Sequence, residues 1–276
     1  MSKSLLRDAV YGAAVGDALG VPYEFRARGS FTCTEMEGWM THDQPPGTWS
    51  DDTSMLIALC DSLRAKRKRV DTADQRTRFL SWLQRGKYTP DGKVFDVGTA
   101  TITALEEGRG CTSERSNGNG SLMRIIPLAF TKASDEEIAA SSAVTHAHPI
   151  SCEACVRYVH IARDLAEGMS VREAVLRGTA DAEPPFDRLS YIAELPESEI
   201  NSSGYVIDTL EAALWCLQTT ESYEACVLAA VNLGRDTDTT ACVAGGLAGI
   251  VYGIDTIPKE WLDALRSKDI IERCLF

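Results

Sequence analysis

The stretch GAAVGDALG, residues 12–20, decides the fold, because it spaces three glycines four residues apart inside an apolar run. A second run repeats this spacing with glycines at positions 245, 249 and 253. Residues four apart share one face of an α-helix, so each run predicts a helix with a face of small residues. Such faces let two helix backbones approach closely. We therefore expect the first helix to pack tightly against a late one.

Helical spacing continues outward from these two runs. Apolar residues recur every three or four positions through 56–63, 154–165 and 206–217, whereas the alternation typical of strands is scarce. Helix-start signals occur in three places: capping-box spacing at Ser134 and Glu137, the same spacing at Ser170 and Glu173, and Pro258, placed to open the last helix. The sequence predicts an all-α protein.

Length and composition indicate one globular domain over residues 1–276. Hydrophobic residues make up 44% and charged residues 25% of the chain, which is ordinary for a folded protein of this size. The net charge of −12 leaves no broad basic face, so binding to nucleic acid is not expected. A monomer is the default expectation.

Two features bear on location. The uncharged segment 239–254 is shorter than the roughly 20 residues that a membrane-spanning helix needs, so we expect a buried helix and no membrane association. The chain holds nine cysteines, an odd number, and carries Arg7 and Asp8 where a signal peptide would need its apolar core. Both observations favour a cytoplasmic protein.

Two acidic motifs each stand at the start of a predicted helix: SDDT at 50–53 and DTDTT at 236–240. Helix capping explains either motif alone, but capping needs one side chain, and here four carboxylates occupy two helix starts. Oxygen donors in this number suit Mg²⁺ or Mn²⁺. If the two helix starts meet, they form a two-metal site, and Asp52 and Asp238 should lie within a few ångströms of a shared cation.

Two further motifs carry polar chemistry. The run SNGNGSLMR, residues 116–124, puts a glycine-rich loop ahead of a predicted apolar helix, so its backbone N–H groups could cradle a phosphate; a plain turn is the alternative. The run THAH at 145–148, followed by Cys152 and Cys155, also admits a zinc site. Cys155 falls in the apolar run of its helix, which favours a structural role.

Taken in order, these motifs resemble the ADP-ribosylglycohydrolase family. The matching segments are GAAVGDALG (12–20) with Glu24 behind it, WSDDT (49–53), FDVGT (95–99), NGSLMR (119–124), THAH (145–148), GYVIDT (204–209) and GRDTDT (234–239). They extend over nearly the whole chain. The resemblance implies an all-α, orthogonal helical bundle with a binuclear Mg²⁺ or Mn²⁺ centre. It also implies an enzyme that removes ADP-ribose from a modified side chain, with arginine favoured over a related N- or O-linked conjugate.

The resemblance further implies roles for individual residues. The metal ligands would be Ser50, Asp51, Asp52, Asp236, Asp238 and Thr239. Substrate contacts would be Asp96 and Gly98 beside the distal ribose, Ser116, Asn117, Gly118 and Asn119 in a diphosphate loop, His146 on the diphosphate side, and Tyr205. Catalysis would involve Glu24 on a mobile loop together with Asp51, Asp52 and Asp238, the proton being moved by Glu24 or by a metal-linked aspartate. Thr99 stands where some members carry an Asn that contacts the substrate.

Two other functions fit part of the sequence. The pair Asp51-Asp52 resembles the start of an aspartate-rich diphosphate motif, as in other magnesium-dependent helical enzymes, but Met55 falls where the next acid should be. A catalytically silent ADP-ribose-binding protein is the third possibility, and the intact acidic motifs argue against it. The expected partner is an ADP-ribosylated protein or a small ADP-ribosyl conjugate.

Overall fold

The structure is a computed structural model that describes residues 3–276, and this range contains α-helices and short 3₁₀-helices but no β-sheet. The all-α prediction is confirmed. The α-helices are α1 (Lys3–Gly20), α2 (Asp51–Ala65), α3 (Thr72–Arg85), α4 (Thr99–Glu107), α5 (Asp135–Ser142), α6 (Pro149–Ala166), α7 (Val171–Gly178), α8 (Val206–Thr219), α9 (Tyr223–Asn232), α10 (Thr237–Tyr252), α11 (Lys259–Ala264) and α12 (Lys268–Cys274).

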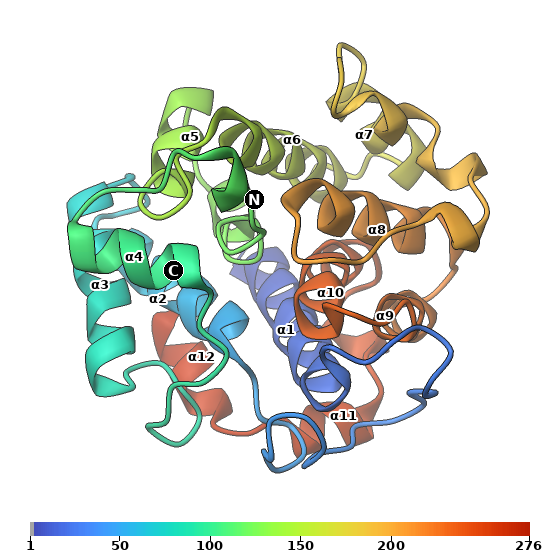
Figure 1. Ribbon diagram of the computed structural model, residues 1–276, viewed down its shortest axis with the longest axis horizontal. Helices are drawn as coiled ribbons and strands as arrows, with labels where there is room; N and C mark the ends of the chain where they lie inside the picture. Colours follow the sequence, from blue (N-terminus) through green and yellow to red (C-terminus); the bar gives the residue numbers. More distant parts are fainter. Residues whose placement is uncertain (1–2) are drawn as a thin grey trace.

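Helices α1 and α10 form the most extensive helix pair and lie side by side at the centre of the molecule (Figure 1). The glycine repeat is the reason they pack so closely. A Cβ atom on Gly12 would lie 2.2 Å from the carbonyl oxygen of Gly245, and one on Gly16 would lie 2.1 Å from that of Ala241. Neither position tolerates a side chain without moving a backbone. The expected tight packing of the first helix against a late one is confirmed.

Gly253 is an exception within the glycine repeat. It follows the end of α10 with a φ of +81°, and a Cβ atom there would meet nothing within 4 Å. Its role is conformational, because L-residues with side chains rarely adopt positive φ. The prediction that Gly253 continues the packing face is therefore wrong.

Three local expectations have mixed outcomes. Ser134 and Glu137 form the full capping box of α5, and Ser170 caps α7 by accepting from the Glu173 amide. Pro258 precedes α11, but this is not the last helix, because α12 follows it. The helix expected directly after the glycine-rich loop is also wrong: turns come first, and then the short 3₁₀-helix Ile126–Phe130. The proline in that short helix lacks the N–H group that a longer helix would need.

One cluster of buried apolar side chains runs from Leu6 to Leu275 and draws on almost every helix. Most of segment 239–254 lies within α10, whose residues from Thr237 to Ile250 are buried, so the buried-helix prediction is confirmed. Within residues 3–276, none of the helices combines the length and the apolar character that crossing a bilayer requires. The single domain, the monomer and the cytoplasmic location stay predictions.

The pair formed by α1 and α10 also positions buried acidic side chains. A Cβ atom on Gly20 would lie 2.3 Å from the Cα of Asp238, so the end of α1 touches the start of α10. One turn earlier, Asp17 accepts hydrogen bonds from the amides of Ser50 and Thr53 and from the Thr53 hydroxyl. A buried aspartate thus fastens the start of α2 to α1, and three helix ends meet at one place.

Candidate active site

The two acidic motifs, far apart in the chain, come together at these helix ends. Carboxylate oxygens of Asp52 and Asp238 lie within 4.8 Å of each other and of Asp17. Oxygens of Asp238 lie equally close to Glu24 and Asp236. We call the set Asp17, Glu24, Asp51, Asp52, Asp236 and Asp238 the acidic centre. The expected meeting of the two helix starts is present in the structure.

The acidic centre is buried and short of hydrogen-bond donors. Both carboxylate oxygens of Asp52, Oδ1 of Asp236 and Oδ2 of Asp238 are buried without a hydrogen-bond partner among the described residues. Burial, followed by the charges of neighbouring carboxylates, raises the pKa of Asp51, Asp52 and Asp238 well above the usual range. An unpaired buried carboxylate is costly, so this arrangement demands a compensating positive charge.

A divalent cation meets that demand. The donors are hard carboxylate oxygens, which Mg²⁺ and Mn²⁺ prefer, and the unpaired oxygens could act as ligands. Two hydroxyl residues named from the sequence stand beside the carboxylates. Ser50 caps α2, its Oγ accepting from the Asp52 amide at 3.2 Å, and Thr239 faces the neighbouring cavity. The residues present therefore fit a metal ion.

A cavity of about 420 Å³ opens beside the acidic centre, a size typical of small-molecule sites. One wall carries acidic side chains and the other carries the glycine-rich loop. Most of the residues named from the sequence line it, namely Glu24, Asp51, Asp96, Gly98, Ser116, Gly118, Asn119, His146, Asp236 and Thr239. The carboxylates of Asp52 and Asp238 sit deeper, behind this lining.

The glycine-rich loop is braced from behind by a fully buried arginine. Arg124 donates to the carbonyl oxygen of Gly120 and to the Thr145 hydroxyl, and its guanidinium stacks over the ring of Phe79. Thr145 in turn bonds Nδ1 of His146 at 2.8 Å. A Cβ atom on Gly120 would lie 2.8 Å from the His146 ring, so this glycine is required for the loop to lie against the histidine.

His146 is neutral in this setting. Burial, followed by the charge of Arg124, lowers the pKa of its imidazole to about 3. The ring faces the cavity between Gly118 and Gly120. A neutral imidazole can present an N–H or a lone pair to a ligand without adding charge.

Three residues expected to contact substrate are placed differently. The Asn119 side chain lines the cavity, but its Nδ2 donates to Asp236 Oδ2 and Thr209 Oγ1, both at 2.9 Å. The backbone amide of Asn119 donates to the carbonyl oxygen of Gly204. Asn117 is buried behind the loop, where its Oδ1 accepts from the Ser151 hydroxyl. Tyr205, paired with Gly118 through a β-bridge, is exposed and stands outside the cavity lining.

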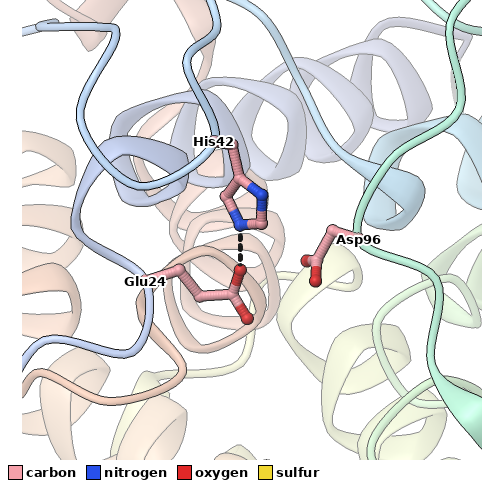
Figure 2. Close-up of side chains that lie close together, drawn as sticks. All are labelled: Glu24, His42 and Asp96. Carbon is pink, nitrogen blue, oxygen red and sulfur yellow. Dashed lines mark hydrogen bonds and ion pairs between the residues drawn. The ribbon is translucent and has the colours of Figure 1, made fainter.

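Figure 2 shows a second polar group at the cavity, formed by Glu24, His42 and Asp96. Their ligating atoms lie within 4.8 Å of one another, and Nε2 of His42 is hydrogen-bonded to Oε2 of Glu24. Burial, followed by the charge of Asp96, raises the pKa of Glu24 to about 10. Asp96 itself holds a φ of +55°, an uncommon conformation for a residue other than glycine.

Sequence reasoning missed three residues of the site. His42 lies in a long loop without periodicity, and nothing in its neighbourhood marks it. Arg115 lines the cavity directly before Ser116, but the sequence analysis named only the loop that begins at Ser116. Asp17 was quoted only as part of a matching segment; a lone carboxylate inside a glycine-rich helix was the available signal.

The alternative zinc site does not form. His148 Nδ1 accepts from the Ile150 amide as a helix cap, and the Cys155 thiol contacts the Ser121 hydroxyl. Across residues 3–276, the groups of side chains close enough to hold a metal ion do not include this set.

An all-helical chain with a buried carboxylate centre on the wall of a polar cavity fits the class of helical enzymes that bind divalent cations. The family model described as ADP-ribosylglycohydrolase matches residues 2–275. This chain belongs to the ADP-ribosylglycohydrolase family.

Individual relatives agree with that assignment. The ADP-ribosylarginine hydrolase Tri1 of Serratia proteamaculans is 35% identical over 96% of this chain and 76% of the relative. The ADP-ribosyl-[dinitrogen reductase] glycohydrolase of Rhodospirillum rubrum is 33% identical over 94% of this chain and 90% of its own. A solved structure titled ADP-ribosylglycohydrolase-related protein complex superposes with a TM-score of 0.83 at 32% identity, covering 99% of this chain and 95% of that one.

Proposed function

We propose that this protein hydrolyses the N-glycosidic bond between ADP-ribose and the arginine of a modified protein, using divalent cations. One observation carries the proposal: the acidic starts of α2 and α10 meet beside a cavity whose other wall is a glycine-rich loop. The relatives named for ADP-ribosylarginine and ADP-ribosyl-protein hydrolysis support the arginine linkage.

The metal ions in this proposal are two Mg²⁺ or Mn²⁺. Their ligands would be Ser50, Asp51, Asp52, Asp236, Asp238 and Thr239, the set whose oxygens are buried or face the cavity. When bound, such ions would act as Lewis acids, orienting the ribose hydroxyls and stabilising developing negative charge on oxygen. Asn119 would hold Asp236 in its ligating orientation through the bond to Oδ2.

The protein's own groups would do the rest. Cleavage adds a hydroxyl group from water to the anomeric carbon and leaves a proton for the departing guanidine nitrogen. Glu24 faces the cavity, and its raised pKa lets the carboxyl group hold a proton near neutral pH, as a shuttle between water and leaving group requires. The nearby carboxylates Asp51 and Asp96 would stabilise the positive charge of the oxocarbenium-like transition state.

The opposite wall would hold the diphosphate. Gly118 and Gly120 line the cavity, and His146 lies against both. Arg115 offers a guanidinium at the same wall, a group that binds phosphate oxygens in pairs. Asp96 and Gly98 close the side assigned to the distal ribose.

The test is to incubate an arginine-ADP-ribosylated protein with the enzyme in Mg²⁺ or in EDTA, beside the double variant Asp51→Asn, Asp238→Asn. Release of free ADP-ribose that depends on metal and is lost in the variant supports the proposal. Binding of ADP-ribose without release would identify a silent binder. Cleavage of the diphosphate instead would identify a different magnesium-dependent hydrolase.

A further inference from the structure

The turn formed by residues 39–44, which we call the His42 turn, is fastened onto the segment that carries Glu24. The Thr41 amide donates to the Pro22 carbonyl oxygen at 3.2 Å, and the Thr41 hydroxyl donates to the Glu24 carbonyl oxygen at 3.0 Å. The side-chain Nε2 of Gln44 closes the turn by donating to the His42 carbonyl oxygen at 2.9 Å. These bonds fix where the His42 side chain can reach.

The residues that follow Glu24 are also held by backbone hydrogen bonds, in this case to the segment before Asp236. The Phe25 amide donates to the Arg235 carbonyl oxygen, and the Arg235 amide donates to the carbonyl oxygen of Arg26. This pair of backbone bonds ties the segment to the residue before Asp236. These bonds hold the Glu24 backbone beside Asp236.

The His42 ring points toward the Glu24 carboxyl group, and Asp96 lies to one side of both (Figure 2). It lies between the rings of Phe25 and Phe95, at centroid distances of 5.9 and 5.2 Å. The imidazole is largely buried, with 14% of its side chain exposed, and its Nε2 bonds the Glu24 carboxyl group. Two aromatic neighbours and one polar contact give the ring a defined orientation.

Glu24 needs such a partner because negative charges surround it. Oxygens of Asp96, Asp236 and Asp238 lie within 4.8 Å of a carboxyl oxygen of Glu24, so once Glu24 has given up its proton, repulsion favours rotation of the side chain toward solvent. A hydrogen bond from an imidazole N–H to a carboxylate opposes that rotation.

We propose that His42 is a positioning residue whose hydrogen bond holds the Glu24 carboxyl group inside the cavity against the repulsion of Asp96, Asp236 and Asp238. The inference rests on the proposed function, in which Glu24 moves the proton. His42 acts through Glu24 and is assigned no contact with substrate. A hydrogen bond to a charged group of this kind corresponds to a rate effect of about 10- to 100-fold.

The first test compares three substitutions by steady-state kinetics on an ADP-ribosylated protein. His42→Ala should lower kcat by about 10- to 100-fold while KM changes by less than about twofold, because only the placement of Glu24 is lost. His42→Gln should restore most of kcat, because the glutamine side-chain nitrogen Nε2 can occupy the position of the imidazole Nε2. His42→Asn, which matches Nδ1 instead, should not restore it.

A double-mutant cycle shows whether the effect passes through Glu24. In a Glu24→Gln background, His42→Ala should cost less than about a further twofold in kcat, because the coupled partner is already altered. The matched control is His160→Ala. His160 also pairs with a carboxylate, Asp135, at 2.7 Å, but it lies on the surface outside this cavity, so kcat should stay at the wild-type value.

A crystal structure of His42→Ala provides a readout that does not depend on activity. The Glu24 side chain should be turned out of the cavity; finding it in place, or finding equal losses in the Ala and Gln variants, overturns the inference. Losses that add fully in the double variant overturn it as well. If wild-type protein releases no ADP-ribose, the proposed function fails, while the crystal structure still decides the role of His42.

Discussion

Replacing Gly16 by alanine tests how the helix packing supports the acidic centre. The new Cβ atom would lie 2.1 Å from the Ala241 carbonyl oxygen, against about 3.4 Å for an ordinary contact, so α1 and α10 must separate by about 1.3 Å at this point. Asp238 lies one turn from Ala241 on α10. Metal–oxygen bonds span only about 2.0–2.6 Å, so a displacement of this size removes Asp238 from a shared ligand set.

We expect Gly16→Ala to lose about 2–4 kcal/mol of unfolding free energy and at least tenfold in Mn²⁺ affinity. Urea unfolding followed by circular dichroism measures the first, and titration calorimetry measures the second. Gly249→Ala is the control, because its Cβ atom would lie 2.3 Å from the Asp8 carbonyl oxygen at the far end of the same helix pair. It should lose similar stability but keep its Mn²⁺ affinity. Equal cation affinity in both variants, or wild-type stability in Gly16→Ala, would refute the reasoning.

Three further predictions address the site. Arg115→Ala should raise the dissociation constant of ADP-ribose about tenfold by calorimetry with little effect on melting temperature, and unchanged affinity would place the diphosphate elsewhere. Saturating Mg²⁺ should raise the wild-type unfolding free energy by about 2–3 kcal/mol at 100 times its dissociation constant, and Asp52→Asn should abolish the rise. His146→Gln should make the free energy of unfolding less sensitive to acid. Between pH 6.5 and 3 the histidine binds a proton in the unfolded state but not in the folded state. The unfolding free energy of the wild type should therefore fall by up to about 1.4 kcal/mol more per pH unit of acidification than that of the variant. Parallel stability curves would contradict the buried, neutral imidazole.

Much of the fold could be predicted because its signals are local. The four-residue glycine repeat predicted a close helix pair, and the structure places Gly12 and Gly16 against the backbone of α10. The same repeat misled at Gly253, since spacing alone does not show that a helix has ended. The apolar segment after the glycine-rich loop misled for a similar reason, because its apolar residues are buried in turns and a 3₁₀-helix.

The site, too, could be predicted where its signals are local and could not be predicted where they are not. Asp51, Asp52, Asp236 and Asp238 were named from their chemistry, because several carboxylates at a helix start are unusual for capping alone. The sequence names Asn119 as a substrate contact, and the residue lines the cavity, but its hydrogen bonds to Thr209 and Asp236 depend on segments about 90 and 120 residues away. The partner of a polar side chain is a property of the whole fold.

By itself the sequence determined that the chain is helical, that two of its helices pack backbone to backbone, and that hard oxygen donors occupy two helix starts. Periodicity, side-chain volume and donor chemistry are properties of neighbouring residues, so a single chain displays them. Only the tertiary structure brought His42 to Glu24, placed Arg115 at the cavity and joined Asp17 to the start of α2. The three residues lie in an aperiodic loop, a short exposed 3₁₀-helix and the end of a helix. The packing of the surrounding helices decides which partners these segments meet.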